Sequence, residues 1–85
     1  IAATILLNQN AFACYYGDSC LEIQDRINLI YKRNGYCFQL PEWAERYGGN
    51  AGCIFNDQSR VPLSLADRQC LDWLVRLRAK LGCSF

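Results

Sequence analysis

The carboxylates of Glu42 and Glu45 are the first groups to consider for chemistry, because residues three positions apart share one side of a helical turn. Two carboxylates placed in this way can act as the acid and base of a glycosidase. The chain has no histidine, which excludes catalysis by a Ser-His-Asp triad, by a Cys-His pair or by two histidines acting as acid and base. A chain of 85 residues also has little room for a substrate cleft. We therefore expect no enzyme activity, with both residues in a solvated loop and Trp43 against the edge of the core.

Cysteine is the other reactive residue type in the sequence. An even number of cysteines in a short chain is typical of a disulfide framework formed in an oxidising compartment. The chain has no C-x-x-C pair and no histidine, which argues against a metal site. The pattern predicts a secreted, extracellular protein with no metal and with three disulfides, built from Cys14, Cys20, Cys37, Cys53, Cys70 and Cys83.

Length and charge limit the number of domains and the kinds of partner that we expect. We expect residues 1–85 to form a single domain. The formal net charge of +1 argues against a nucleic-acid partner, because such a partner favours a clearly basic surface. No stretch approaches the ~20 apolar residues of a transmembrane segment. Because the chain begins at Ile1 and lacks methionine, we expect that a signal or pro-segment was removed or that the sequence is an excised fragment.

A first helix is predicted from about Cys20 to Asn34. Ser19 and Glu22 have the spacing of a capping box, and Gly35 is suited to end the helix. One face collects apolar residues at spacings of three and four, which are Cys20, Ile23, Ile27, Ile30 and Tyr31.

A second helix is predicted from about Leu65 to Leu81, between Ser64 as its cap and Gly82. Its expected buried stripe consists of Ala66, Cys70, Trp73, Leu74, Leu77 and Leu81. The opposite side holds Arg68, Asp72, Arg76 and Lys80. Together with Arg78, these basic residues suggest a phosphate site, but the interleaved Asp67 and Asp72 favour an ordinary solvated face.

Shorter runs rich in β-branched and aromatic residues predict strands at Thr4–Leu7, Ala11–Tyr16, Tyr36–Leu40 and Ala51–Asn56. The order of elements resembles a split βαβ arrangement. The fold class we expect is therefore α+β: a small two-layer α/β sandwich in which two helices pack on one face of an antiparallel sheet.

Six cysteines allow fifteen pairings, and the expected elements favour one of them. Cys20 and Cys70 lie on the apolar stripes of two helices that should pack side by side. Cys37 and Cys53 lie on neighbouring antiparallel runs. Cys14 and Cys83 then remain to tie the first strand to the end of the chain.

The cysteine environments resemble those of a known family. The stretch 10–14 (NAFAC), followed by Ser19-Cys20 at a helix start, is similar to the N-terminal part of the alpha subunit of the type-six smut-virus killer toxin. The stretch 51–57 (AGCIFND), followed by a helix with Cys70 and a final Cys83, is similar to its C-terminal half. The resemblance implies a compact α/β sandwich secreted by fungi, which serves as a killer toxin or as an effector. It also implies no enzyme activity and no cofactor.

We therefore expect a secreted, cysteine-rich effector or killer-toxin-like protein that binds a host or competitor target, either a protein or a cell surface. The candidate recognition residues are large aromatic side chains, namely Tyr15, Tyr16, Trp43 and Tyr47. The alternative is an inhibitor of a secreted hydrolase, which would present a rigid loop at Gln39–Asn50 or Asn56–Leu63. Assembly into a homo- or heterodimer is left open.

Overall fold

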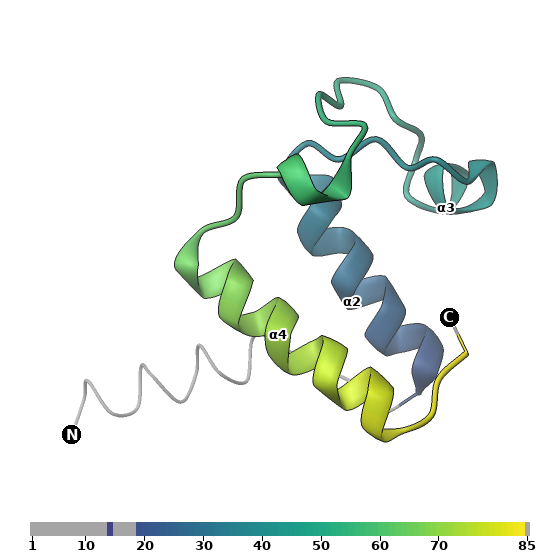
Figure 1. The fold of residues 1–85 in the computed structure, drawn as a ribbon. Helices are drawn as coiled ribbons and strands as arrows, with labels where there is room; N and C mark the ends of the chain where they lie inside the picture. Colours follow the sequence, from purple (N-terminus) through teal and green to yellow (C-terminus); the bar gives the residue numbers. More distant parts are fainter. Residues whose placement is uncertain (1–13, 15–18, 85) are drawn as a thin grey trace, which may run out of the picture.

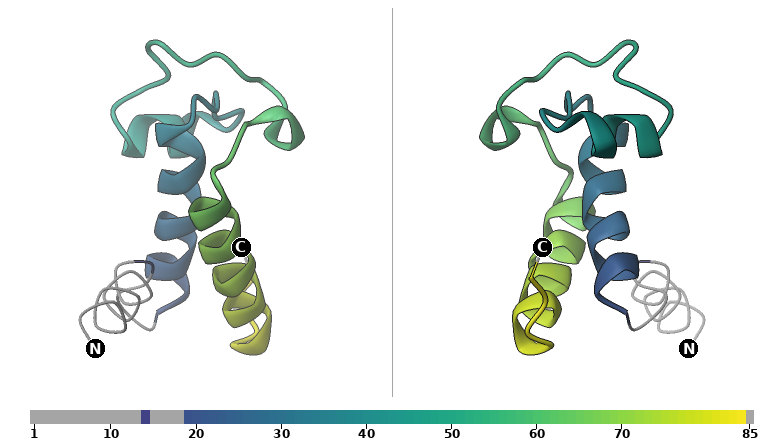
Figure 2. Two further views of the ribbon diagram at one scale, coloured as in Figure 1. Left: turned by 90° about the vertical axis from the view of Figure 1, so that its left-hand side faces the viewer. Right: turned by 90° about the vertical axis from the view of Figure 1, so that its right-hand side faces the viewer.

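A computed structural model of the chain describes residue 14 and residues 19–84. The named elements are helical (Figure 1), and they are α2 (Cys20–Arg33), α3 (Pro41–Arg46), the 3-10 helix η1 (Gln58–Arg60) and α4 (Leu65–Lys80). α2 and α4 run in opposite directions beside each other, and α3 lies near the end of α2 where that helix finishes (Figures 1 and 2).

Both ends of α2 are formed by the residues that the sequence predicts. The Ser19 hydroxyl accepts a hydrogen bond from the Glu22 amide, and the Glu22 carboxylate accepts from the Ser19 amide, which completes the capping box. Gly35 has a φ of +97°, a left-handed conformation that costs glycine little, and its amide donates to the Lys32 carbonyl.

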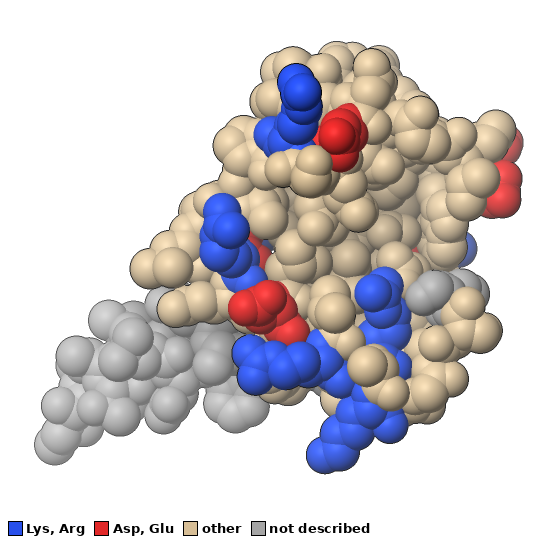
Figure 3. Space-filling view, in the orientation of Figure 1, with Lys and Arg blue, Asp and Glu red and all other residues tan. Residues whose placement is uncertain are grey.

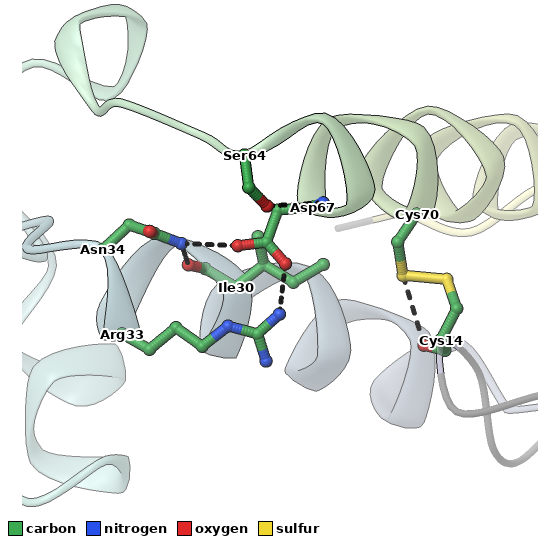
Figure 4. Close-up of polar contacts among 7 residues, drawn as sticks. All are labelled: Cys14, Ile30, Arg33, Asn34, Ser64, Asp67 and Cys70. Carbon is green, nitrogen blue, oxygen red and sulfur yellow. Dashed lines mark hydrogen bonds and ion pairs between the residues drawn. A yellow bond between two sulfur atoms is a disulfide. The ribbon is translucent and has the colours of Figure 1, made fainter. Parts of the chain in front are cut away.

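The start of α4 joins the two long helices. The Ser64 hydroxyl accepts a hydrogen bond from the Asp67 amide, as predicted. The Asp67 side chain instead points to α2, where it forms an ion pair with Arg33 and accepts a 3.0 Å hydrogen bond from Asn34 Nδ2 (Figure 4). One carboxylate therefore links the start of α4 to the end of α2.

Five fully or almost fully buried aliphatic side chains form the core between α2 and α4, namely Ile23, Ile27, Ile30, Leu71 and Leu74. The predicted stripe of α2 is confirmed, because its three isoleucines are buried. The predicted stripe of α4 is partly wrong: Leu71 was missed, while Trp73 is 45% exposed and Leu81 is 48% exposed. Since α2 is the one long helix beside it among residues 19–84, α4 buries a narrow stripe centred on Leu74.

The expected α+β sandwich is wrong. Within the described residues there is no sheet, and the only β pairing is a single parallel bridge between Tyr36 and Phe55. The predicted strands Tyr36–Leu40 and Ala51–Asn56 do lie beside each other, since the Cys37 amide donates to the Phe55 carbonyl at 2.8 Å. The predicted strands Thr4–Leu7 and Ala11–Tyr16 lie outside the described residues, apart from Cys14.

The polar groups near Phe38 explain why this pairing does not extend beyond a single bridge. The Asn50 side chain accepts a hydrogen bond from the Phe38 amide at 3.0 Å and donates to the Phe38 carbonyl at 2.9 Å. An amide side chain thus occupies the positions that a neighbouring strand would take. Pro41 then begins α3, because proline fits the first position of a helix and has no amide to give to a ladder.

Three disulfides are present, as predicted, but their pairing is only partly as expected. The Cys37–Cys53 bond is confirmed. The expected Cys14–Cys83 and Cys20–Cys70 bonds are replaced by Cys14–Cys70 and Cys20–Cys83. The antiparallel helices explain the exchange: Cys20 begins α2 and therefore lies beside the end of α4, where Cys83 follows, whereas Cys70 belongs to the first half of α4.

Candidate binding site

The candidate site is the aromatic platform, which we define as Phe38, Trp43 and Tyr47. The Trp43 and Tyr47 rings stack with centroids 6.2 Å apart and planes 9° from parallel. The Phe38 ring is almost fully buried and lies 5.3 Å from the Tyr47 ring, on the inner side. α3 supplies Trp43 and is followed by Tyr47, and none of its own residues is fully buried. The platform therefore has a buried base and a half-buried outer ring.

The aromatic platform continues inward as a line of rings. Phe38 and Tyr36 meet edge to face with centroids 5.1 Å apart, and Tyr36 meets Tyr31 of α2 at 5.9 Å. Aromatic pairs at these separations add stabilisation beyond the area they bury. Trp43 is thus supported by ring contacts that reach back to α2.

Three side chains form what we call the latch, which fastens α3 to α2: Asp25, Arg46 and Tyr47. Arg46 donates from Nε and from a terminal guanidinium nitrogen to the two Asp25 oxygens, at 2.8 and 2.7 Å. The Tyr47 hydroxyl donates to Asp25 Oδ1 at 2.6 Å. The Asp25 carboxylate therefore receives three hydrogen bonds, and two of them form the planar arrangement that arginine and carboxylate favour.

The latch shifts the acidity of its members. The hydrogen bond from Arg46 outweighs burial and, with the bond from Tyr47, lowers the pKa of Asp25. Burial, and then the hydrogen bond to Asp25, raise the pKa of the Tyr47 phenol to about 12. At neutral pH Asp25 is therefore a carboxylate and Tyr47 a neutral donor, which is the pairing that the contacts require.

A buried amide chain extends the latch toward α4. Asn28 Nδ2 donates to the Tyr47 hydroxyl at 3.1 Å, and Gln24 Nε2 donates to Asn28 Oδ1 at 2.9 Å. An Arg78 guanidinium nitrogen of α4 donates to Gln24 Oε1 at 2.8 Å. Gln24 and Asn28 are almost fully buried, so each of these bonds satisfies a polar group that would otherwise be costly to bury.

Of the four predicted recognition residues, the structure brings Trp43 and Tyr47 together, whereas Tyr15 and Tyr16 lie outside the described residues. Tyr47 is also a structural support, because its hydroxyl binds Asp25 and Asn28. Removal of Tyr47 should therefore lower stability in addition to any effect on recognition. Trp43 is left as the better candidate contact residue.

The carboxylates of Glu42 and Glu45 are both exposed on α3, which is a helix and not the expected loop. An open cavity of about 380 Å³ lies elsewhere, between the end of α2 and residues 50–54, and neither glutamate lines it. The two residues therefore face solvent on a short helix and take no part in this cavity.

The basic residues of α4 divide into two groups. Arg68, Arg76 and Lys80 are exposed, as expected for a solvated face. Arg78 is half-buried because its guanidinium reaches Gln24. Within the described residues, no three metal-ligating side chains of the Cys, Asp or Glu type gather into a possible ion site. None of the described helices is long and apolar enough to span a bilayer.

Sequence reasoning missed Asp25, Asn28 and Gln24, which hold the platform in place. Gln24 and Asn28 stand four positions apart on α2 beside its apolar stripe. This spacing indicates that their side chains can form a hydrogen bond with each other. Their other partners are many residues away in the sequence, so the contacts themselves could not be foreseen.

No protein-family model, curated protein sequence or solved structure matches this chain.

Proposed function

We propose that this chain is a secreted, cysteine-rich effector or killer-toxin-like protein that binds a host or competitor target and does not catalyse a reaction. Three disulfides support the extracellular part of the proposal, because such bonds form and persist in oxidising compartments. The killer-toxin part rests on the cysteine environments alone, since the helical fold differs from the expected sandwich.

The observation that carries a binding role is the fixed orientation of Trp43. Its ring stacks on Tyr47, whose hydroxyl is held from α2 by Asp25 and Asn28. A large side chain that is already held in place loses little conformational entropy when a partner covers it. Tryptophan and tyrosine are also the residue types most often found at the energetic centre of interfaces. The aromatic platform therefore suits recognition of a protein or a cell-surface component.

A second candidate function is inhibition of a secreted hydrolase. It is favoured by the closure of residues 37–53 by the Cys37–Cys53 bond. The Asn50 side chain pins the Phe38 backbone inside this loop. The closed loop includes the whole predicted segment Gln39–Asn50, and a stiff loop of this kind can occupy an enzyme cleft without a large loss of entropy.

The proposal is tested by adding fluorescently labelled, oxidised protein to cultured fungal cells and measuring both cell binding and growth. We expect Trp43→Ala to weaken binding by about tenfold or more, because a central aromatic residue commonly carries that share of an interface. The matched control is Ile54→Ala, since Ile54 is 73% exposed and lies outside the platform. The control should bind as the parent does.

Both variants should show the circular dichroism spectrum of the parent, so that a loss of binding reports the surface and not the fold. Equal binding by Trp43→Ala and the parent would contradict the proposed site. Saturable inhibition of a purified hydrolase, with no effect on cells, would favour the second candidate instead.

A further inference from the structure

A row of apolar side chains lies along α4 on the side away from Val75. Trp73, Leu77 and Leu81 stand four positions apart, which places them one above another on the helix surface. Trp73 and Leu81 are 45% and 48% exposed. The neighbouring row holds Arg76 and Lys80, both exposed. We call these five residues the α4 edge.

The second half of α4 is basic, although the whole chain is nearly neutral. The chain has nine basic and eight acidic residues, yet positions 73–84 contain three basic residues and no acidic one. Figure 3 shows Lys and Arg side chains gathered over the lower part of the visible face, where the second half of α4 lies. Within the described part of the chain, neither Arg76 nor Lys80 forms a salt bridge.

We propose that the α4 edge binds the surface of a membrane that contains anionic lipids. Trp73 and Leu81, the exposed members of the row, would enter the boundary between headgroups and acyl chains, where tryptophan is favoured. Leu77 is half-buried between them and packs against the core. Arg76 and Lys80 have long apolar stems and can lie along this boundary while their charged ends reach lipid phosphates or carboxylates. The combination of an apolar row with an adjacent cationic row is the pattern of helices that lie on membranes.

The shape of the α4 edge also favours a bilayer over an acidic protein. It follows the surface of a single helix, α4, and none of the residues that line the cavity between α2 and residues 50–54 belongs to it. A deformable bilayer can follow the surface of a single helix, whereas a protein partner would need a matching groove. The α4 edge is separate from the aromatic platform, so this inference does not depend on the proposed function.

The test measures sedimentation of the oxidised chain with vesicles of phosphatidylcholine containing phosphatidylserine. Each basic residue at an anionic surface contributes about a fivefold change in binding. The double variant Arg76→Gln/Lys80→Gln should therefore bind about 25-fold more weakly. The matched control is Arg60→Gln/Arg68→Gln, which removes the same charge from exposed residues outside the α4 edge. The control should stay within about threefold of the parent, because salt screens distant charges.

Trp73 provides a direct probe when Trp43 is replaced by phenylalanine, since Trp73 is then the only tryptophan. Its emission should shift to shorter wavelength on addition of the anionic vesicles, because the ring leaves water. Leu81→Ser should weaken binding by about tenfold through the loss of apolar burial. Leu65→Ser is the control, since Leu65 is 71% exposed at the other end of α4.

Three results would overturn the inference. The first is equal binding to vesicles of phosphatidylcholine alone, and the second is an equal loss of binding in the two charge variants. The third is a chain that does not bind vesicles but self-associates through Trp73 in sedimentation velocity. The α4 edge would then be a contact surface between two copies of this chain. None of these results bears on the Trp43 experiment with cells, so the two proposals fail separately.

Discussion

The two long helices and the segment between them are held in different ways. α2 and α4 share an aliphatic core and are the site of two disulfides. Residues 36–64, which we call the cap, bury Cys37, Phe38 and Val61 and otherwise depend on the latch, the Asn50 contacts and the Cys37–Cys53 bond. The helices are therefore held mainly by apolar burial, to which Asp67 adds an ion pair with Arg33, whereas the cap depends more strongly on polar contacts that single substitutions or a change of pH can remove.

The disulfides give the largest expected contrast between these regions. Replacing Cys20 and Cys83 with serine opens a loop of 63 residues and should lower the free energy of unfolding by about 4 kcal/mol. Replacing Cys37 and Cys53 opens a loop of 16 residues and should cost about 3 kcal/mol. Urea unfolding without reductant measures both values. A larger loss from the shorter loop would show that the cap is the more important region for stability.

Removal of a core side chain tests the helical region without changing its bonds. Leu74 is fully buried, so Leu74→Ala should lower the free energy of unfolding by about 3 kcal/mol. The neighbouring Val75 is 39% exposed, and Val75→Ala should change stability by about 0.5 kcal/mol or less. Urea unfolding curves of the two variants should differ clearly, and similar curves would contradict the assignment of the core to this stripe.

The latch should open locally when its carboxylate is neutralised. Asp25→Asn removes the charge that Arg46 and Tyr47 bind. The free energy of unfolding should fall by about 1–2 kcal/mol, because the ion pair is partly exposed and contributes little by itself. Hydrogen exchange should become faster at the Ala44 and Tyr47 amides and stay unchanged in α4.

Asp72→Asn is the matched control, because Asp72 is exposed and forms no salt bridge within the described residues. Faster exchange throughout α2 and α4 in Asp25→Asn would show that the cap and the helices open together.

The smallest expected effect is the pH dependence of the cap. The folded-state pKa of Asp25 is lowered, so its stabilising contribution is present above the ordinary value of 3.8 and is lost as the pH falls through the lowered pKa. The pKa of Tyr47 is raised from 10.0 to about 12, so its contribution is complete below pH 10.0 and is lost as the pH rises through about 12.

Ultraviolet absorbance during an alkaline titration measures the tyrosinate ions directly. Subtracting the curve of Tyr47→Phe from that of the parent should isolate one phenol that ionises near pH 12. An isolated phenol that ionises at the ordinary 10.0 would show that the hydroxyl is not held by Asp25.

The parts of the fold that follow from local rules could be predicted. The bounds of α2 and α4 agree with the expected helices to within one residue at each end, because capping residues and spacing set them. The capping box of Ser19 and Glu22 is confirmed for the same reason. The short helix α3 was missed, although Pro41 followed by Glu42 is a usual helix start.

The parts that depend on distant contacts could not be predicted. A run such as Tyr36–Leu40 has the composition of a strand, but the Asn50 side chain takes the backbone partners that a strand would need. The expected sheet then led to the wrong burial for Trp73, which would have been covered had a sheet lain beneath α4. In the candidate site, the types of Trp43 and Tyr47 suggested recognition, whereas Asp25 acquires its role only when the chain brings Arg46 and Tyr47 to it.

The order of the disulfides along the chain has a consequence for cleavage by proteases. Cys14 and Cys20 lie before the cap, and their partners Cys70 and Cys83 lie after it. A single cut anywhere between Leu21 and Gln69 therefore leaves two fragments that remain joined by both bonds. Such a nicked molecule keeps its mass, apart from one added water, until it is reduced. A cut in the surface that carries Trp43 would thus alter the molecule without releasing any part of it.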